Sequence, residues 1–300
     1  MRLVFFGTPA EGAVILDALV AAGHTVDLVV TRADKRRARR GDPEPSPVRA
    51  IAEQLGLTVA TPARAGDIAD ELRASGAELG VVVAYGQILP PAVLEALPRG
   101  LVNLHFSLLP RWRGAAPVER AILAGDTETG VAVMRLEEGL DTGPVFASVR
   151  TEIGPDETAG ELRARLVDLG TPLLIDTLAR LPTSEPEPQH GDPTYADKFK
   201  VEEFRLDPRR RAEELQRIVR AGNPRPGAWL RVGGRRLKVL RARPDPEASS
   251  APGVIDEDAR LMTNDGALSL LEVQPEGRRA MPGTDWRRGL SAADVRVDRP

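Results

Sequence analysis

The 300-residue sequence contains no cysteine, few aromatic residues and no long apolar run. The absence of cysteine excludes disulfides, thiolate metal sites and a cysteine nucleophile, and it is typical of proteins in a reducing compartment. No apolar stretch approaches the roughly 20 residues that span a bilayer, and the apolar start of the chain is too short for a secretion signal. We therefore expect a cytoplasmic protein without a membrane anchor.

Histidine is also scarce, and the chain contains only His24, His105 and His190. Three scattered histidines and no cysteine offer little for a metal site, so we expect no metal. The sequence has no Gly-x-Ser-x-Gly turn for a serine nucleophile, no P-loop, and no Gly-x-Gly-x-x-Gly turn after its first apolar run. These absences disfavour serine hydrolases, nucleoside triphosphatases and NAD-dependent enzymes.

The composition otherwise fits a folded protein of two domains. Hydrophobic residues make up 42% and charged residues 28% of the chain, which is close to the average for soluble proteins. A domain commonly spans about 150 residues, so a chain of this length suggests two. Because prolines and polar residues gather after residue 181, we predict an N-terminal domain over 1–181, a linker over 182–203 and a C-terminal domain over 204–300.

The N-terminal domain alternates short apolar runs with helical patterns. Runs rich in β-branched residues are typical of parallel strands buried on both faces, and here they cover residues 3–6, 26–30, 79–83, 101–104 and 131–136. The alternation predicts an α/β domain with a doubly wound, mostly parallel, Rossmann-like sheet. Ligands of such sheets bind at the carboxyl ends of the strands.

The C-terminal domain follows a different pattern. We expect Asp207 and Pro208 to cap a helix whose apolar stripe contains Leu215 and Ile218. Short strand-like runs separated by Gly-Gly, Asp-Gly and Pro-Gly turns follow, over residues 228–232, 236–242, 253–255, 260–263 and 267–273. An OB-like β-barrel is the simplest closed arrangement of five such strands.

Charge is unevenly distributed along the chain. The formal net charge is −3 overall, but the last hundred residues carry 20 basic and 16 acidic side chains, a net +4. In addition, six of the nine residues from Arg32 to Arg40 are basic. Such a run is either a solvated loop or a contact for a polyanion.

Two segments after predicted strands carry candidate catalytic side chains. Asn103 and His105 lie two positions apart and so share one face of a strand, where an amide and an imidazole suit stabilisation of a developing oxyanion. Asp141, in a glycine-flanked turn after the strand 131–136, lies at the same edge and would relay protons with His105. On these residues alone, a buried structural histidine and an exposed turn carboxylate remain alternatives.

Taken together, several segments resemble the 10-formyltetrahydrofolate-dependent formyltransferases. The resemblance is carried by Phe5-Phe6-Gly7-Thr8-Pro9, by Val83-Ala84-Tyr85-Gly86, by Asn103-x-His105-x-Ser107-Leu108-Leu109-Pro110-x-x-Arg113-Gly114 and by Gly139-Leu140-Asp141-Thr142-Gly143. Residues 111–117, 46–48 and 274–281 are most similar to the members that formylate the methionine of initiator tRNA. The resemblance extends through essentially the whole chain.

The resemblance implies roles for these residues. Asn103 and His105 would stabilise the oxyanion formed when an amine attacks the formyl carbon, and Asp141 would orient or charge His105 and assist proton transfer. The formyl donor, 10-formyltetrahydrofolate, is then a co-substrate, and no metal takes part. By the same resemblance the donor lies against Tyr85, Gly86, Ile88, Leu89, Ser107, Leu108, Leu109 and Pro110.

The resemblance also assigns the basic segment to initiator methionyl-tRNA. Arg39 aligns best with an important arginine of the family, and the other predicted contacts are Lys35, Arg36, Arg37, Arg40, Lys198 and Lys200. A monomer that does not contact membranes is expected. Two other functions remain open: formylation of an amino-sugar nucleotide or another small amine, and a non-catalytic RNA-binding module.

Overall fold

A computed structural model describes residues 1–34, 44–181, 183–246, 251–290 and 296–298. These residues form two compact units. The first contains Met1–Pro117, Thr129–Thr151 and Ala164–Asp197, and the second contains Val118–Glu128, Glu152–Arg163 and Lys198–Pro300. The domain limits drawn from the sequence at residues 181 and 203 stay predictions.

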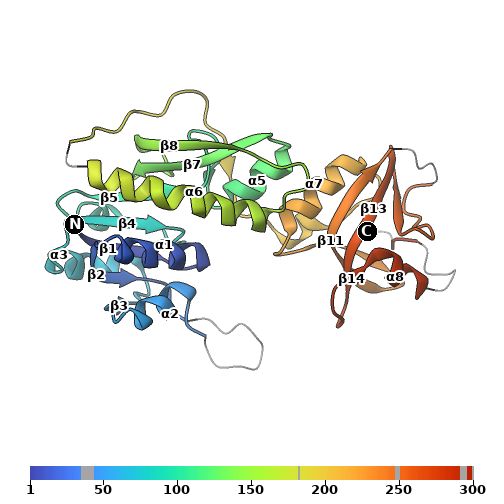
Figure 1. Ribbon diagram of the computed structural model, residues 1–300, viewed down its shortest axis with the longest axis horizontal. Helices are drawn as coiled ribbons and strands as arrows, with labels where there is room; N and C mark the ends of the chain where they lie inside the picture. Colours follow the sequence, from blue (N-terminus) through green and yellow to red (C-terminus); the bar gives the residue numbers. More distant parts are fainter. Residues whose placement is uncertain (35–43, 182, 247–250, 291–295, 299–300) are drawn as a thin grey trace. The chain divides into compact units, whose positions relative to one another are not determined.

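The first unit is built on a seven-stranded sheet (Figure 1). Its strands lie in the order β3 (Val59–Ala60), β2 (Thr25–Val30), β1 (Arg2–Gly7), β4 (Leu79–Val83), β5 (Leu101–His105), β7 (Glu128–Arg135) and β8 (Val145–Glu152). The strands from β3 to β5 are parallel, and β7 runs antiparallel to β5. The predicted α/β fold with a mostly parallel sheet is confirmed.

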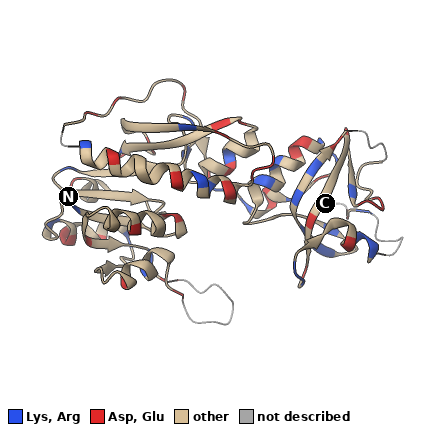
Figure 2. Cartoon of the chain, in the orientation of Figure 1, with Lys and Arg blue, Asp and Glu red and all other residues tan. Residues whose placement is uncertain are grey.

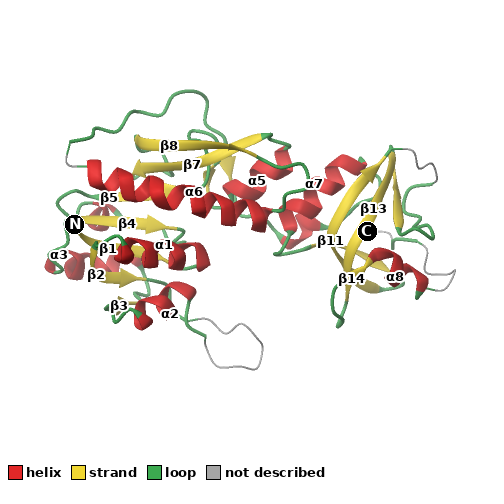
Figure 3. Cartoon of the chain, in the orientation of Figure 1, coloured by secondary structure: helices red, strands yellow, loops and turns green. Residues whose placement is uncertain are grey.

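Helices lie between these strands along the chain, and one long helix follows the last of them (Figure 3). They are α1 (Ala10–Ala21), α2 (Pro47–Gln54), the 3-10 helix η1 (Ala65–Ile68), α3 (Ala69–Ala74), α4 (Pro91–Leu94), α5 (Pro117–Ala124) and α6 (Ala159–Arg180). The hydroxyl of Ser46 caps α2 by accepting a hydrogen bond from the N–H of Arg49 at 3.1 Å, and Pro47 follows at the first helical position. A cap residue followed by proline is the start signal expected from the sequence.

The segment before residue 198 is held to the first unit by short strand pairs. β9 (Tyr195–Ala196) pairs in parallel with β6 (Arg113–Gly114), and Glu187 forms a bridge with Val145. Part of the predicted linker is therefore ordered against the loop that follows β5.

The second unit contains a curled antiparallel sheet of five strands. Its elements are β10 (Ala228–Val232), β11 (Arg235–Asp245), β12 (Arg260–Thr263), β13 (Gly266–Pro275) and β14 (Met281–Pro282), with the helices η2 (Val201–Phe204), α7 (Ala212–Gly222) and α8 (Gly283–Arg288). The prediction of a small barrel-like β domain is confirmed. The expected strand over 253–255 is wrong, because Val254 and Ile255 make only isolated bridges, and β14 is the fifth strand instead.

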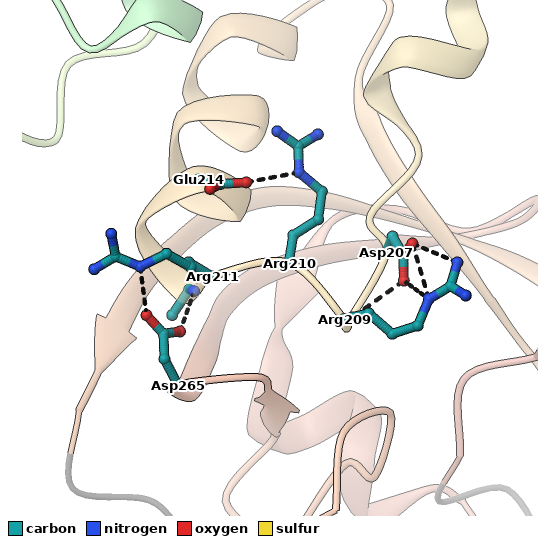
Figure 4. A network of polar contacts seen from close by, with 7 residues as sticks. Asp207, Arg209, Arg210, Arg211, Glu214 and Asp265 are labelled. Carbon is teal, nitrogen blue, oxygen red and sulfur yellow. Dashed lines mark hydrogen bonds and ion pairs between the residues drawn. The ribbon is translucent and has the colours of Figure 1, made fainter.

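The expected cap of α7 is also wrong. The helix begins at Ala212, and its N–H donates to the carboxylate of Asp265 in the β12–β13 turn at 2.9 Å (Figure 4). The same carboxylate accepts from Nε of Arg211 at 2.9 Å. The Arg211 guanidinium and then the Ala212 amide hold the pKa of Asp265 below its usual range. Asp207 instead binds the N–H and the guanidinium of Arg209.

The start of α6 is stabilised by a reciprocal pair of hydrogen bonds. The carboxylate of Glu161 accepts from the N–H of Thr158 at 2.9 Å, and the hydroxyl of Thr158 accepts from the N–H of Glu161 at 3.3 Å. This is the Thr-x-x-Glu capping box, which satisfies two N–H groups that a helix start leaves unpaired. Thr158, with further help from Arg241, lowers the pKa of Glu161 to about 2.

Replacing Glu161 by glutamine is expected to lower the free energy of unfolding by about 1 kcal/mol at neutral pH. Because the folded-state pKa of about 2 lies below the ordinary value of 4.5, the carboxylate stabilises the fold fully above that ordinary value and loses this effect as the pH falls towards 2. Denaturant unfolding at neutral and acid pH should therefore show a smaller acid loss in the variant. The exposed Glu257→Gln is the matched control, and an identical acid loss in wild type and Glu161→Gln would contradict the prediction.

Candidate active site

The end of β5 presents two polar side chains from a buried strand. Asn103 and His105 share one face of β5, which lies between β4 and β7, and they are 9% and 5% exposed. Within the described residues the side-chain amide of Asn103 has no hydrogen-bond partner. A nearly buried amide without a protein partner is available to a bound molecule.

Hydrogen bonding fixes the ring of His105. Its Nε2 lies 2.9 Å from the carbonyl oxygen of Trp112, and because a carbonyl only accepts, Nε2 carries a hydrogen. Nδ1 is therefore the nitrogen without a hydrogen in the neutral ring. It faces Oδ2 of Asp141 at 3.7 Å, a separation suited to an ion pair when the ring is charged.

Asp141 is held in the β7–β8 loop by its own carboxylate and by the glycines around it. Oδ2 accepts a hydrogen bond from the N–H of Gly114 at 2.7 Å. The residue has a φ of 50°, in the left-handed region. At Gly143 a Cβ atom would lie 2.0 Å from the carbonyl oxygen of Arg135, so no larger residue fits there. The predicted approach of Asp141 to His105 is thus present in the structure.

The loop after His105 is organised by internal bonds. Ser107 is fully buried, and its hydroxyl donates to the carbonyl of Arg111 at 2.6 Å. Trp112 has a φ of 61°, and its N–H donates to the hydroxyl of Thr194 at 2.9 Å. These bonds hold the loop in the conformation in which the carbonyl of Trp112 points towards His105. Ser107 therefore has a structural place in the loop, whatever else it contacts.

The residues predicted to contact the formyl donor fall into two groups. Tyr85 is buried, with its ring edge-on to Phe6, and its hydroxyl has no partner among the described residues. Burial raises the pKa of this hydroxyl, and the charge of Arg32 opposes that shift. Ile88 is 88% exposed and Leu89 is half-buried against the core.

The second group follows His105. Beyond the buried Ser107, the side chains of Leu108, Leu109 and Pro110 are half-buried. Leu108 packs on β7, where a Cβ atom at Gly130 would lie 2.5 Å from its Cδ2. An orphaned polar atom, an exposed isoleucine and half-buried leucines suit a flat ring with an apolar face and polar edges. The residues present fit a folate, and their contacts with it stay a prediction, as does the position of Gly86.

The predicted tRNA contacts are only partly described. Lys35, Arg36, Arg37, Arg39 and Arg40 lie outside the described residues, whereas Lys198 and Lys200 are exposed beside η2 in the second unit. Further Lys and Arg residues recur through that unit (Figure 2).

Gln189 and the carbonyl of Trp112 are parts of the site that the sequence did not predict. Gln189 lies in the segment interpreted as a linker, but its side chain bonds to both loops at the end of β5. Because every residue has a backbone carbonyl, the sequence does not show which carbonyl bonds to His105. For Gln189 the only signal is an uncharged polar residue inside a proline-rich segment, which does not distinguish a bonded side chain from a solvated one.

Within the described ranges, no helix combines the length and the apolar character needed to cross a bilayer. In the same ranges, no three histidine, aspartate or glutamate side chains lie together in an arrangement that could hold a metal ion.

The mostly parallel sheet of the first unit and the curled antiparallel sheet of the second match the folds of formyltransferases. The family model described as "Formyl transferase" matches residues 1–178, and the model for the formyl transferase C-terminal domain matches 198–291. The chain belongs to the formyl transferase family, and it is a formyltransferase.

Similar proteins agree with this assignment. The chain is 50% identical over 299 residues to a methionyl-tRNA formyltransferase of Thermus thermophilus, covering 98% of this chain and 97% of the relative. It is 46% identical to that of Paracoccus denitrificans (strain Pd 1222), covering 98% and 99%. In fold it is similar to HypX from Aquifex aeolicus in complex with tetrahydrofolic acid, with a TM-score of 0.67 at 17% identity over 95% of this chain and 46% of that one.

Proposed function

We propose that the protein transfers the formyl group of 10-formyltetrahydrofolate to the free amino group of initiator methionyl-tRNA. The observation that carries the proposal is the Asp141 carboxylate 3.7 Å from Nδ1 of His105, in a chain that is 50% identical along 98% of its length to a methionyl-tRNA formyltransferase.

The side chains that meet at the end of β5 have different roles in the reaction. The amino group of the methionine attacks the formyl carbon, and negative charge develops on the formyl oxygen. The amide N–H of Asn103 donates to that oxygen, and the ring of His105 adds positive charge once Nδ1 has taken up the proton of the attacking amine. Both side chains are fixed before the reaction and shielded from water. Asp141 receives the proton that the attacking amine releases, directly or through Nδ1 of His105. The bond between the formyl carbon and the folate nitrogen then breaks, and that nitrogen takes up the proton held by Asp141 or His105, so atoms and charge balance.

The formyl donor supplies the electrophilic carbon when it is bound. Tyr85, Gly86, Ile88 and Leu89 hold it on one side, and the loop Ser107–Pro110 holds it on the other. Half-buried leucines favour the face of the ring, and the buried Tyr85 hydroxyl, which has no partner among the described residues, offers a polar contact at its edge.

A basic face of the second unit supports the tRNA part of the proposal. On the paired strands β10 and β11, Trp229 stands opposite Lys238 and Arg231 opposite Arg236. The guanidinium of Arg236 lies 4.4 Å from the centre of the Trp229 ring, and that of Arg205 lies 5.5 Å from it. An aromatic ring among cationic side chains is typical of surfaces that bind RNA. An amino-sugar nucleotide would not need such a face.

A formyl-transfer assay tests the proposal. Purified protein with 10-formyltetrahydrofolate should formylate methionyl-tRNA and leave dTDP-linked amino sugars unchanged. Transfer to the amino sugar and not to methionyl-tRNA would establish the alternative acceptor. Binding of tRNA without turnover of either acceptor would instead indicate a non-catalytic RNA-binding module.

Replacing Arg39 by alanine is expected to weaken binding of methionyl-tRNA and to leave binding of the formyl donor unchanged. If its guanidinium contacts a phosphate, the slope of log K against log salt should fall by about one. Binding titrations across a range of salt concentrations measure this slope. Arg73→Ala, which removes an exposed guanidinium paired with Asp70 on α3, is the control. Equal slopes for wild type and Arg39→Ala would mean that the segment is merely solvated.

A further inference from the structure

The side-chain amide of Gln189 forms hydrogen bonds through both its nitrogen and its oxygen to the two loops that meet at the end of β5. Its Nε2 donates to the carbonyl oxygens of Asp141 at 2.9 Å and Gly143 at 2.8 Å. Its Oε1 accepts from Nε and Nη2 of Arg113, at 3.1 and 2.7 Å. Since Gly114, next to Arg113, donates its N–H to the Asp141 carboxylate, the three segments form a closed ring of hydrogen bonds.

The backbone on either side of Gln189 is itself anchored. Before it, Glu187 exchanges two backbone hydrogen bonds with Val145, at 2.7 and 2.9 Å. After it, the carbonyl of Thr194 accepts from Arg113, and the N–H of Thr194 donates to Pro110. The amide of Gln189 therefore approaches the β7–β8 loop from a fixed position.

Asp141 needs such support because of its backbone conformation. A residue other than glycine with a φ of 50° adopts an unfavourable conformation that persists only when the surrounding structure holds it. Gln189 donates hydrogen bonds to the carbonyl of Asp141 itself and to that of Gly143, and so restrains the turn on both sides of Thr142. Without these bonds the carboxylate is free to turn away from His105.

We infer that Gln189 is a positioning residue for formyl transfer, which keeps the Asp141 carboxylate beside Nδ1 of His105. The inference rests on the proposed function of that site. Gln189 acts through Asp141, because within the described ranges its side chain bonds to the two loops and not to the ring of His105.

Steady-state kinetics of Gln189→Ala give the first test. Because small misplacements of a reacting group are costly, kcat should fall by up to about 100-fold while KM for both substrates stays unchanged. The neighbouring His190 is exposed, and His190→Gln should retain the wild-type kcat. A thermal melt of each variant shows that the fold is kept.

Nitrogen-15 NMR of the histidine rings gives a second readout that needs no substrate. The chain has only three histidines, so the signals of His105 can be assigned, and His190→Gln removes one of the others. Gln189→Ala should shift the Nδ1 resonance of His105, and His190→Gln should not. If wild type fails to formylate methionyl-tRNA, the proposed function fails, but this readout still reports on Gln189.

Gln189→Glu tests the donor function of the amide apart from its acceptor function. It also replaces the alanine variant as a test if that variant does not fold. The carboxylate keeps an acceptor for Arg113 but loses both donors to the β7–β8 loop, so kcat should fall as in Gln189→Ala. Wild-type kcat in Gln189→Glu would overturn the inference. So would a loss of kcat in either variant with the His105 resonance unmoved.

Discussion

Replacing Asp141 by asparagine is expected to lower kcat for formyl transfer by about 10³- to 10⁴-fold and to leave binding of the formyl donor nearly unchanged. The carboxamide has almost the same shape, and its oxygen can keep the 2.7 Å bond from Gly114. The substitution removes the negative charge that faces Nδ1 of His105 at 3.7 Å, because the oxygen that accepts from Gly114 is the same atom that faces Nδ1. The uncharged carboxamide gives no counter-charge to the ring and cannot accept the proton of the attacking amine.

The control for this variant is Glu138→Gln in the same loop. Glu138 is exposed, so its substitution removes an equal charge a few residues away without touching His105. Steady-state rates, with equilibrium binding of the formyl donor, distinguish the two variants. A rate for Asp141→Asn within the range of Glu138→Gln would show that the carboxylate has no chemical part.

The strands of the first unit could be predicted because they are buried on both faces. β1, β4 and β5 lie inside a parallel sheet and read as continuous apolar runs. β8 was missed because exposed and half-buried residues alternate along it, and Arg150 and Glu152 interrupt the apolar pattern. The helix start at Ala212 was missed because its cap, Asp265, is supplied by a turn far along the chain.

The candidate site could be predicted where its chemistry lies in strand-end side chains. Asn103 and His105 lie on one face of β5, as the alternation of side chains along a strand predicts. The expected shared edge for Asp141 is wrong, because β7 runs antiparallel to β5 and its last residue, Arg135, pairs with Val102 near the start of β5. Asp141 reaches His105 through the path of the β7–β8 loop. The carbonyl of Trp112 and the amide of Gln189 reach the site through loop conformations and long-range pairing of β6 with β9. No local pattern encodes such contacts.

We expect variants of the side chains that touch the reacting atoms to lose more activity than variants of the residue that positions them. Asp141 and Asn103 would touch the reacting atoms, whereas Gln189 acts on them only through its hydrogen bonds to the loop that carries Asp141. Loss of a reacting group removes a contribution made only in the transition state, so kcat should fall more for Asp141 and Asn103 than for Gln189.

Replacing Asn103 by alanine is expected to lower kcat by about 10²- to 10³-fold, with little change in KM for either substrate. Its amide is nearly buried on β5 and has no partner within the described residues, so its removal leaves no protein group unpaired. The lost hydrogen bond is the one that would strengthen as charge develops on the formyl oxygen. Steady-state kinetics with methionyl-tRNA and 10-formyltetrahydrofolate measure the effect.

Two further variants show whether the amide acts on charge. Asn103→Asp has the same shape but places a carboxylate where negative charge develops, so its kcat should be lower still than that of Asn103→Ala. Asn264→Ala, at an exposed turn of the second unit, should keep the wild-type rate. If Asn103→Asp is as active as wild type, the oxyanion is stabilised elsewhere, and the side chain of Asn103 serves only to pack the end of β5.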